Sequence, residues 1–135
     1  MNNISSINNQ TNFKKSKIFV LSTCFNEEEV INKFIERVSS IEIVSNLILV
    51  DDGSSDSTIT QIKKYKDNLK DSKSSFKITT IELSRNFGKE AAILAGLDYS
   101  KGQCDALVII DCDLQDPPEL IPKMIKSWNE GAEIV

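Results

Sequence analysis

A short apolar run that ends in acidic residues constrains the fold of this chain more than any other feature. Residues 107–110 (LVII) are followed at once by residues 111–116 (DCDLQD) and by the pair Pro117-Pro118. A short run of Leu, Val and Ile bounded by polar residues predicts a buried strand. Strands covered on both faces belong to parallel sheets in α/β proteins, and ligands of such sheets bind at the carboxyl ends of the strands. We therefore expect the three acids of residues 111–116 to lie at a ligand site.

The rest of the chain repeats the same pattern of a strand followed by polar residues. Residues 18–21 (IFVL) and 47–50 (LILV) predict two more buried strands, and residues 78–83 (ITTIEL) predict a strand nearer an edge. Apolar residues at helical spacing follow each run, so strands and helices alternate. The prediction is an α/β fold, a mostly parallel sheet flanked by helices.

The domain is expected to span residues 17–135. Residues 1–16 are rich in Asn and Ser and have no usable period, which predicts a disordered polar tail. Residues 131–135 (GAEIV) resemble a helix stop followed by the start of another strand. We therefore expect the domain to be truncated, with the sheet incomplete at the C-terminus.

Composition excludes several classes of function. At 135 residues the chain is one domain or a piece of one. Its net charge of -4 argues against a nucleic-acid partner, and its three cysteines, with no CxxC spacing, indicate a reducing compartment and no structural zinc. No apolar segment is long enough to predict a transmembrane helix. The chain has no histidine, so it contains no Ser-His-Asp triad, no Cys-His pair and no histidine general base.

Two loops raise a choice between ligand binding and local structure. Asn26 is a predicted helix N-cap, with the acids of residues 27–29 in the first helical turn; Glu27, nearest the strand, is equally suited to face a ligand. Asp51-Asp52 end the second strand, and a turn with capping explains residues 53–57 but not two adjacent carboxylates. Asp52 is therefore favoured as a ligand contact over a structural role.

The acids after the last strand have the spacing of a metal site. Asp111 and Asp113 project to the same side of an extended chain, and two carboxylates held together repel each other unless a cation is present. Gln115 adds an amide oxygen two residues further on. Mg²⁺ and Mn²⁺ prefer such oxygen ligands together with substrate phosphates. The pattern predicts a divalent-metal site with room for a diphosphate.

Two cations lie at another predicted strand-to-helix turn. Arg85 and Lys89 precede or open the helix that follows the third strand, where helix N–H groups favour anions. A phosphate contact and a surface salt bridge are equally consistent with them. With no histidine in the chain, Lewis-acid stabilisation of a departing diphosphate by the metal is the favoured chemistry. The residues alone thus predict a metal–diphosphate nucleotide site suited to sugar transfer.

Four motifs resemble the family 2 glycosyltransferases, which have the GT-A fold. They are residues 20–27 (VLSTCFNE), 48–56 (ILVDDGSSD), 83–90 (LSRNFGKE) and 111–119 (DCDLQDPPE). The last two are most similar to the branch that loads sugars onto polyprenyl phosphates, such as bactoprenol glucosyltransferases and dolichyl-phosphate mannosyltransferases. The resemblance runs from residue 18 to residue 135 and implies a GT-A sheet that forms the donor-binding part of the enzyme.

The resemblance implies a role for each matching residue. The nucleotide-binding set would be Thr23, Phe25, Glu27, Val50, Asp52, Arg85, Lys89, Asp111 and Cys112. The catalytic pair would be Asp111 and Asp113, and the Mg²⁺ or Mn²⁺ ligands would be Asp111, Asp113 and Gln115. The family often has Pro where Thr23 stands and Tyr where Phe25 stands, so a hydrogen bond from a Tyr hydroxyl is lost here while stacking is retained.

The resemblance also implies a reaction and its partners. The expected reaction moves a sugar from a UDP-glucose-like or GDP-mannose-like donor to an acceptor, a polyprenyl phosphate in the parent protein, by metal-assisted inverting transfer. The expected location is the cytoplasm, or the cytoplasmic face of a membrane in the parent, and a homo-oligomer is compatible with the sequence. Family members continue with acceptor-site residues and, in this branch, transmembrane helices, none of which are present in this chain.

Two other classes of protein share part of this sequence pattern. A non-catalytic nucleotide-binding or interaction fragment would follow if the acceptor half is needed for turnover. A response-regulator receiver also clusters acids at strand ends, but its acid pair follows the first strand, whereas Asp51-Asp52 follow the second. The receiver also needs a Thr or Ser and a Lys after later strands, which this chain lacks. The receiver is therefore disfavoured.

Overall fold

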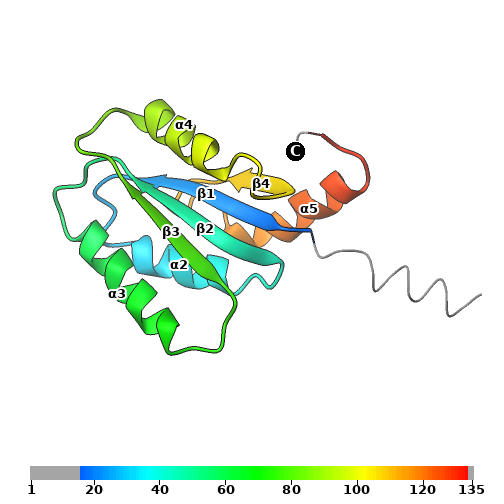
Figure 1. The fold of residues 1–135 in the computed structure, drawn as a ribbon, viewed down its shortest axis with the longest axis horizontal. Coiled ribbons are helices and arrows are strands. Elements are labelled where there is room, and N and C mark those ends of the chain that lie inside the picture. The colour runs from blue at the N-terminus through cyan, green and yellow to red at the C-terminus, as the bar shows by residue number, and fades with distance from the viewer. Residues whose placement is uncertain (1–15, 134–135) are drawn as a thin grey trace, which may run out of the picture.

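The computed structural model describes residues 16–133. Four strands form one parallel sheet in the order β3-β2-β1-β4 (Figure 1). These strands are β1 (Ile18–Cys24), β2 (Val44–Asp51), β3 (Lys77–Glu82) and β4 (Ala106–Ile109). The predicted α/β fold with a parallel sheet is confirmed. The predicted tail falls almost entirely on residues 1–15, and the last two residues of the predicted final strand are 134–135, so both predictions lie outside the described residues.

Helices cover both faces of the sheet, as the apolar stripes predict. Figure 1 shows α4 on one face and α2, α3 and α5 on the other. The helices are α2 (Ile31–Ser39), α3 (Thr58–Lys70), α4 (Lys89–Ser100) and α5 (Ile121–Asn129), with a short 3₁₀ turn η1 (Pro118–Leu120) directly before α5. The larger apolar core lies under α2, α3 and α5, and a smaller one lies under α4. None of the helices within residues 16–133 is long and apolar enough to cross a membrane.

Helix α4 packs unusually close to the sheet because it carries small residues on its inner side. Gly96 and Ala92 are buried there. A Cβ atom added at Gly96 would lie 2.2 Å from Leu21 Cδ1, and the Leu21 side chain is fully buried. The helix therefore approaches β1 at a distance that no larger residue at position 96 permits.

Strand β4 differs from the expectation of a strand buried on both faces. Within residues 16–133 it pairs only with β1, so it forms one edge of the described sheet. Val108 and the following Ile110 are buried, but Ile109 is 48% exposed and Leu107 is half-buried. The expectation was wrong in this respect because a run of apolar residues does not distinguish a central strand from an edge strand.

The start of α2 also differs from the expectation. The helix begins at Ile31 with Val30 at the capping position, and no side chain caps it. Asn26 instead has a left-handed backbone (φ 53°), and its side chain reaches a neighbouring loop. The prediction that Asn26 caps this helix, with residues 27–29 in its first turn, was wrong, because Asn26 bonds to the loop after β2 and the helix starts later.

Candidate functional site

The loops that follow the strands meet at the carboxyl edge of the sheet. The register pairs Cys24 of β1 with Asp51 of β2, and Leu21 of β1 with Ile109 of β4. The Ile110 N–H continues this pairing by donating to the Leu21 carbonyl (3.1 Å). The loops after β1, β2 and β4 therefore leave the sheet side by side. This agrees with the prediction that the acids after the last strand lie where parallel strands end.

A cavity of roughly 280 Å³ opens between these loops. Its lining contains eight of the predicted site residues together with Cys24. The lining residues are Thr23, Cys24, Phe25, Glu27, Asp52, Lys89, Asp111, Cys112 and Asp113. They come from three strand-end loops and from the first turn of α4, so tertiary folding gathers residues that are up to 90 positions apart in the sequence.

Hydrogen bonds tie the loop after β1 to the loop after β2. The Asn26 side-chain oxygen accepts from the Ser55 N–H (2.9 Å), and the Glu27 N–H donates to Thr58 Oγ1 (2.9 Å). Glu28 Oε2 accepts from the Ser57 N–H (3.0 Å). Ser57 precedes α3, so the Glu28 carboxylate complements the positive end of α3 and not that of α2. These bonds hold Glu27 at the cavity wall.

Asp51 and Asp52 have different tasks. Both Asp51 oxygens accept from Ser54, from its N–H (2.9 Å) and its hydroxyl (2.6 Å), which closes the turn after β2. The Asp52 oxygens accept from the N–H groups of Phe87 (2.8 Å) and Gly88 (3.1 Å). Asp52 is buried, lines the cavity, and at the same time holds the start of α4. Asp52 therefore has a structural role at a position that lines the cavity, and its ligand contact stays a prediction.

Gly53 permits this arrangement. Its φ of 78° is left-handed, and a Cβ atom there would lie 2.4 Å from the backbone carbonyl carbon of Arg85. The loop after β3 thus crosses directly over the turn after β2. Only glycine accommodates both the backbone conformation and the close approach.

Lys89 and Asp111 form the central ion pair of the cavity. Lys89 Nζ lies 2.5 Å from Asp111 Oδ1, with both side chains about half exposed. The hydrogen bond to Asp111 raises the pKa of the Lys89 ammonium, with Asp113 adding to the effect. Lys89 therefore stays charged at neutral pH and supplies one positive charge among the acids of the cavity.

The other acids of the cavity repel one another. The pKa of Glu27 is raised above its usual range by burial first, and then by the charges of Asp113 and Asp56. The Asp113 carboxylate accepts a hydrogen bond from the Gln115 N–H (3.0 Å). Excess negative charge at Asp113 and Glu27 is the electrostatic condition that a divalent cation relieves.

The carboxylates present fit a hard cation only in part. Asp111 and Asp113 line the same cavity and offer oxygen ligands. Within residues 16–133, however, no three His, Cys, Asp or Glu side chains are arranged so that they alone could hold a metal ion. A metal here would take its remaining ligands from an amide oxygen such as that of Gln115, from a bound diphosphate or from water.

Two buried thiols back the cavity, and sequence reasoning assigned a role to only one of them. The Cys112 thiol donates to the Thr23 carbonyl (3.4 Å), and the Cys24 thiol lies 3.7 Å from both the Val50 carbonyl and Asp51 Oδ1. Burial, followed by the charges of Glu27 and Asp113, raises the pKa of Cys112 to about 12. Both thiols are therefore neutral packing groups. The position of Cys24 at the end of the first strand was the available signal for its place in the site.

Three predicted site residues do not line the cavity. The Val50 side chain is fully buried in the core under α4. Arg85 is exposed, with its guanidinium carbon 4.6 Å from the centre of the Phe87 ring. Gln115 is exposed, and its backbone N–H donates to the Asp113 carboxylate.

Comparison with known proteins agrees with this arrangement. The family model "Glycosyl transferase family 2" matches residues 19–135. An uncharacterized glycosyltransferase of Synechocystis sp. is 42% identical over 111 residues, covering 82% of this chain and 32% of that protein. The bactoprenol glucosyl transferase of Shigella phage SfX is 38% identical over 125 residues, covering 88% of this chain and 38% of that protein.

A solved structure shows the same fold. The mannosyltransferase of Pyrobaculum calidifontis, in complex with GDP-Man and Mn²⁺, matches with a TM-score of 0.71 at 18% identity, over 84% of this chain and 32% of that one. The predicted GT-A fold is thereby confirmed. The chain spans about a third of the length of the curated relatives it matches. Because the family model matches nearly the whole described part and the fold agrees, the chain belongs to glycosyl transferase family 2.

Proposed function

We propose that this chain is the donor-binding part of a glycosyltransferase that uses a nucleotide-diphosphate sugar, UDP-glucose-like or GDP-mannose-like. The observation that carries the proposal is the cavity in which Lys89, Asp111 and Asp113 meet at the carboxyl edge of a family 2 sheet. That edge is where ligands of parallel sheets bind. The relatives' names, a bactoprenol glucosyl transferase and a mannosyltransferase bound to GDP-Man, support the class of donor.

In this proposal the nucleotide lies along the loops after β1 and β2. Phe25 is 44% exposed at the cavity, so its ring is available to stack on a base. Thr23, Glu27 and Asp52 face the nucleoside, and Val50 supports the wall from beneath. Asp111 and the Cys112 backbone contact the ribose, while Lys89 neutralises the diphosphate. Arg85 does not line the cavity; it lies by the nucleotide or its phosphates, on the loop that crosses over Gly53.

We assign the divalent cation, Mg²⁺ or Mn²⁺, to Asp113 and Asp111, with Gln115 as an additional oxygen ligand. The bound Mn²⁺ in the solved relative supports this choice. When bound, the cation supplies Lewis-acid stabilisation of the departing diphosphate. The residues of the chain position the donor, and Lys89, whose pKa is raised further by Asp111, supplies a positive charge at neutral pH.

The acceptor in the proposed reaction is a lipid phosphate, a polyprenyl phosphate as in the bactoprenol enzyme, reached from the cytoplasmic face of a membrane. One oxygen of that phosphate forms a bond to the anomeric carbon as the bond to the diphosphate breaks, which inverts the configuration. The phosphate oxygen is already an anion, so the reaction needs no general base. This agrees with a chain that contains no histidine.

Titration with UDP-glucose and GDP-mannose, with and without Mn²⁺, tests the donor site. Saturable binding that Mn²⁺ strengthens is expected for one of the two donors. Asp113→Asn keeps the shape of the side chain but removes its charge, so it is expected to weaken the Mn²⁺-dependent binding at least about 10-fold, as removal of a metal ligand does.

The matched control for that titration is Asp98→Asn. Asp98 is exposed on α4 and does not line this cavity. The substitution therefore also removes one negative charge, but at a position outside the site. Binding that Asp113→Asn leaves unchanged would exclude Asp113 as a metal ligand. No binding of either donor by the wild-type protein would exclude the proposed function.

A further inference from the structure

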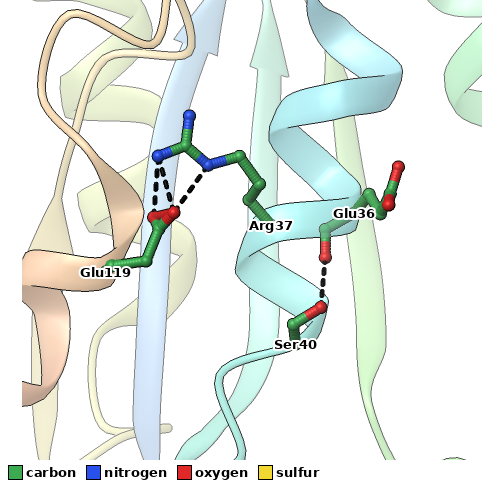
Figure 2. A network of polar contacts seen from close by, with 4 residues as sticks. All are labelled: Glu36, Arg37, Ser40 and Glu119. Carbon is green, nitrogen blue, oxygen red and sulfur yellow. Dashed lines mark hydrogen bonds and ion pairs between the residues drawn. The ribbon is translucent and has the colours of Figure 1, made fainter.

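An ion pair beyond the C-terminal end of the Asp-x-Asp loop (residues 111–117) joins two segments that are 82 residues apart (Figure 2). Arg37 Nε donates to Glu119 Oε1 and an Arg37 Nη donates to Glu119 Oε2, each at 2.8 Å. The two parallel bonds match the fork of the guanidinium to both carboxylate oxygens. The pairing lowers the pKa of Glu119. The ion pair is therefore present at neutral pH, and its two hydrogen bonds fix the orientation of the guanidinium relative to the carboxylate.

The Arg37 end of the pair is rigidly held. Arg37 lies in the last turn of α2, whose inner residues Ile31, Phe34, Ile35 and Val38 are fully buried. The Ser40 hydroxyl and N–H both reach the Glu36 carbonyl, at 2.9 and 3.2 Å, and close the helix end (Figure 2). The exposed fraction of the Arg37 side chain is only 26%. The backbone at Arg37 is therefore held against the core by α2, and the side chain is only partly exposed.

The Glu119 end is attached to the loop that carries the cavity acids. Glu119 lies in η1, next to the buried Pro118 and directly after residues 111–117. At its front, the loop is held by the Ile110 N–H and by the Cys112 thiol, both bonded to β1 carbonyls. Between these ends the loop has little regular structure, and Leu114 has a left-handed φ of 66°. At its rear, the loop is attached through the buried Pro118 and through the pair of Glu119 with Arg37.

This pair differs from the other ion pairs on the surface. Lys63 and Glu82 lie 3.6 Å apart, make one contact, and are exposed to 59% and 50%. Exposed single contacts of that kind contribute little to stability, whereas a bidentate arginine pair with one partner held in place is the case where geometry matters.

We propose that Arg37 and Glu119 are positioning residues, a clamp that holds residues 111–117 in the path where Asp111 and Asp113 face the cavity. Neither residue lines that cavity, so the clamp acts through the loop. Its consequence for metal and donor binding rests on the proposed function, but its effect on the loop does not.

Amide hydrogen exchange of the metal-free protein tests the effect on the loop. The peptide that spans residues 110–121 contains four hydrogen-bonded amides, those of Ile110, Gln115, Leu120 and Ile121. Arg37→Gln and Glu119→Gln are each expected to speed exchange in this peptide several-fold. Glu82→Gln, which breaks the exposed pair to Lys63, is the matched control and is expected to leave it unchanged.

Conservative and swapped variants separate positioning from general stability. Arg37→Lys keeps the charge but loses the fork, so it is expected to retain only part of the protection. The double variant Arg37→Glu with Glu119→Arg restores opposite charges and is expected to recover part of it. Thermal unfolding of all variants should stay close to that of the wild type, because the pair lies outside the apolar core.

Donor titration in the presence of Mn²⁺ tests the functional consequence. The clamp variants are expected to bind about 10-fold more weakly, the size of effect seen when groups that orient metal ligands are removed, and Glu82→Gln is expected to bind as the wild type does. Loop exchange equal to the wild type in both single variants would overturn the clamp, whether or not any donor binds. Faster exchange with unchanged donor affinity would overturn its role in binding. Absence of donor binding by the wild type would count against the proposed function alone.

Discussion

At the scale of single residues, the site combines binding groups with groups that hold the loops. Lys89 and Asp111 meet in the cavity although 22 positions separate them. Asp52 serves the cavity and α4 together. A side chain that also holds an element in place is a poor target for a simple loss-of-binding experiment, because its replacement alters folding.

Asp52→Asn is expected to lower the free energy of unfolding by about 1–2 kcal/mol, since the amide can accept from only one of the two N–H groups that the carboxylate now binds. Denaturant unfolding measures the change. Asp98→Asn removes an exposed charge from the same helix and is expected to leave stability within about 0.5 kcal/mol of the wild type. Equal stability of the two variants would contradict the capping role.

At the scale of elements, close packing of α4 on β1 places Lys89 over the cavity. The helix starts at the cavity edge with Lys89 and runs back over the sheet, and Gly96 makes that approach possible. Loops after β1 and β2 are tied to each other before either helix begins. The loops after β1 and β2 and the start of α4 therefore form three parts of the cavity lining.

Gly96→Ala tests the helix packing through the sign of its effect. In an exposed helix this change stabilises by roughly 0.5–1 kcal/mol. Here the new Cβ would overlap the buried Leu21 side chain, so we expect destabilisation by about 1–3 kcal/mol. Denaturant unfolding measures it, with Leu94→Ala at a 65% exposed position of the same helix as the control. A stabilised Gly96→Ala protein would show that the helix does not lie this close.

At the scale of the whole molecule, the described part is one sheet with two apolar cores and open edges at β3 and β4. The cores meet the site through Cys24 and Cys112, which are buried members of the larger core and also line the cavity. Stability of the fold and integrity of the site are therefore coupled at these two thiols.

The coupling predicts sensitivity to alkaline pH. Burial, followed by nearby thiol and carboxylate charge, raises the pKa of the Cys24 thiol above its ordinary value. The unfolded chain loses this proton near pH 8.5 while the folded chain keeps it. Stability contributed by the neutral thiol is thus present below that pH and is lost as pH rises, at a slope that approaches about 1.4 kcal/mol per pH unit.

Chemical denaturation between pH 7 and pH 10.5 measures that slope. Cys24→Ala is expected to be less stable at pH 7 but to lose less stability on going to pH 10.5. Cys104→Ala, at a half-buried position outside the cavity, serves as the comparison. The same slope in the wild type and in Cys24→Ala would contradict the prediction.

The amino-acid sequence alone was enough to predict the strands, their parallel arrangement and most of the residues around the cavity. Apolar runs of four or more residues mark strands, and the acids that follow them meet because parallel strands end at one edge. The same reasoning predicts a site with Asp111, Asp113 and Lys89, and these three residues line one cavity.

The hydrogen-bond or ion-pair partner of each polar side chain can be read only from the folded structure. Asn26 and Glu28 bond to the loop after β2, Asp52 holds α4, and Arg37 pairs with Glu119, all across 28 or more residues of sequence. The folded structure also decided that β4 is an edge and that the Val50 side chain points into the core. Hydrophobic periodicity reports the environment of a residue along its own element, whereas these pairings depend on the order of strands and on the distances between loops.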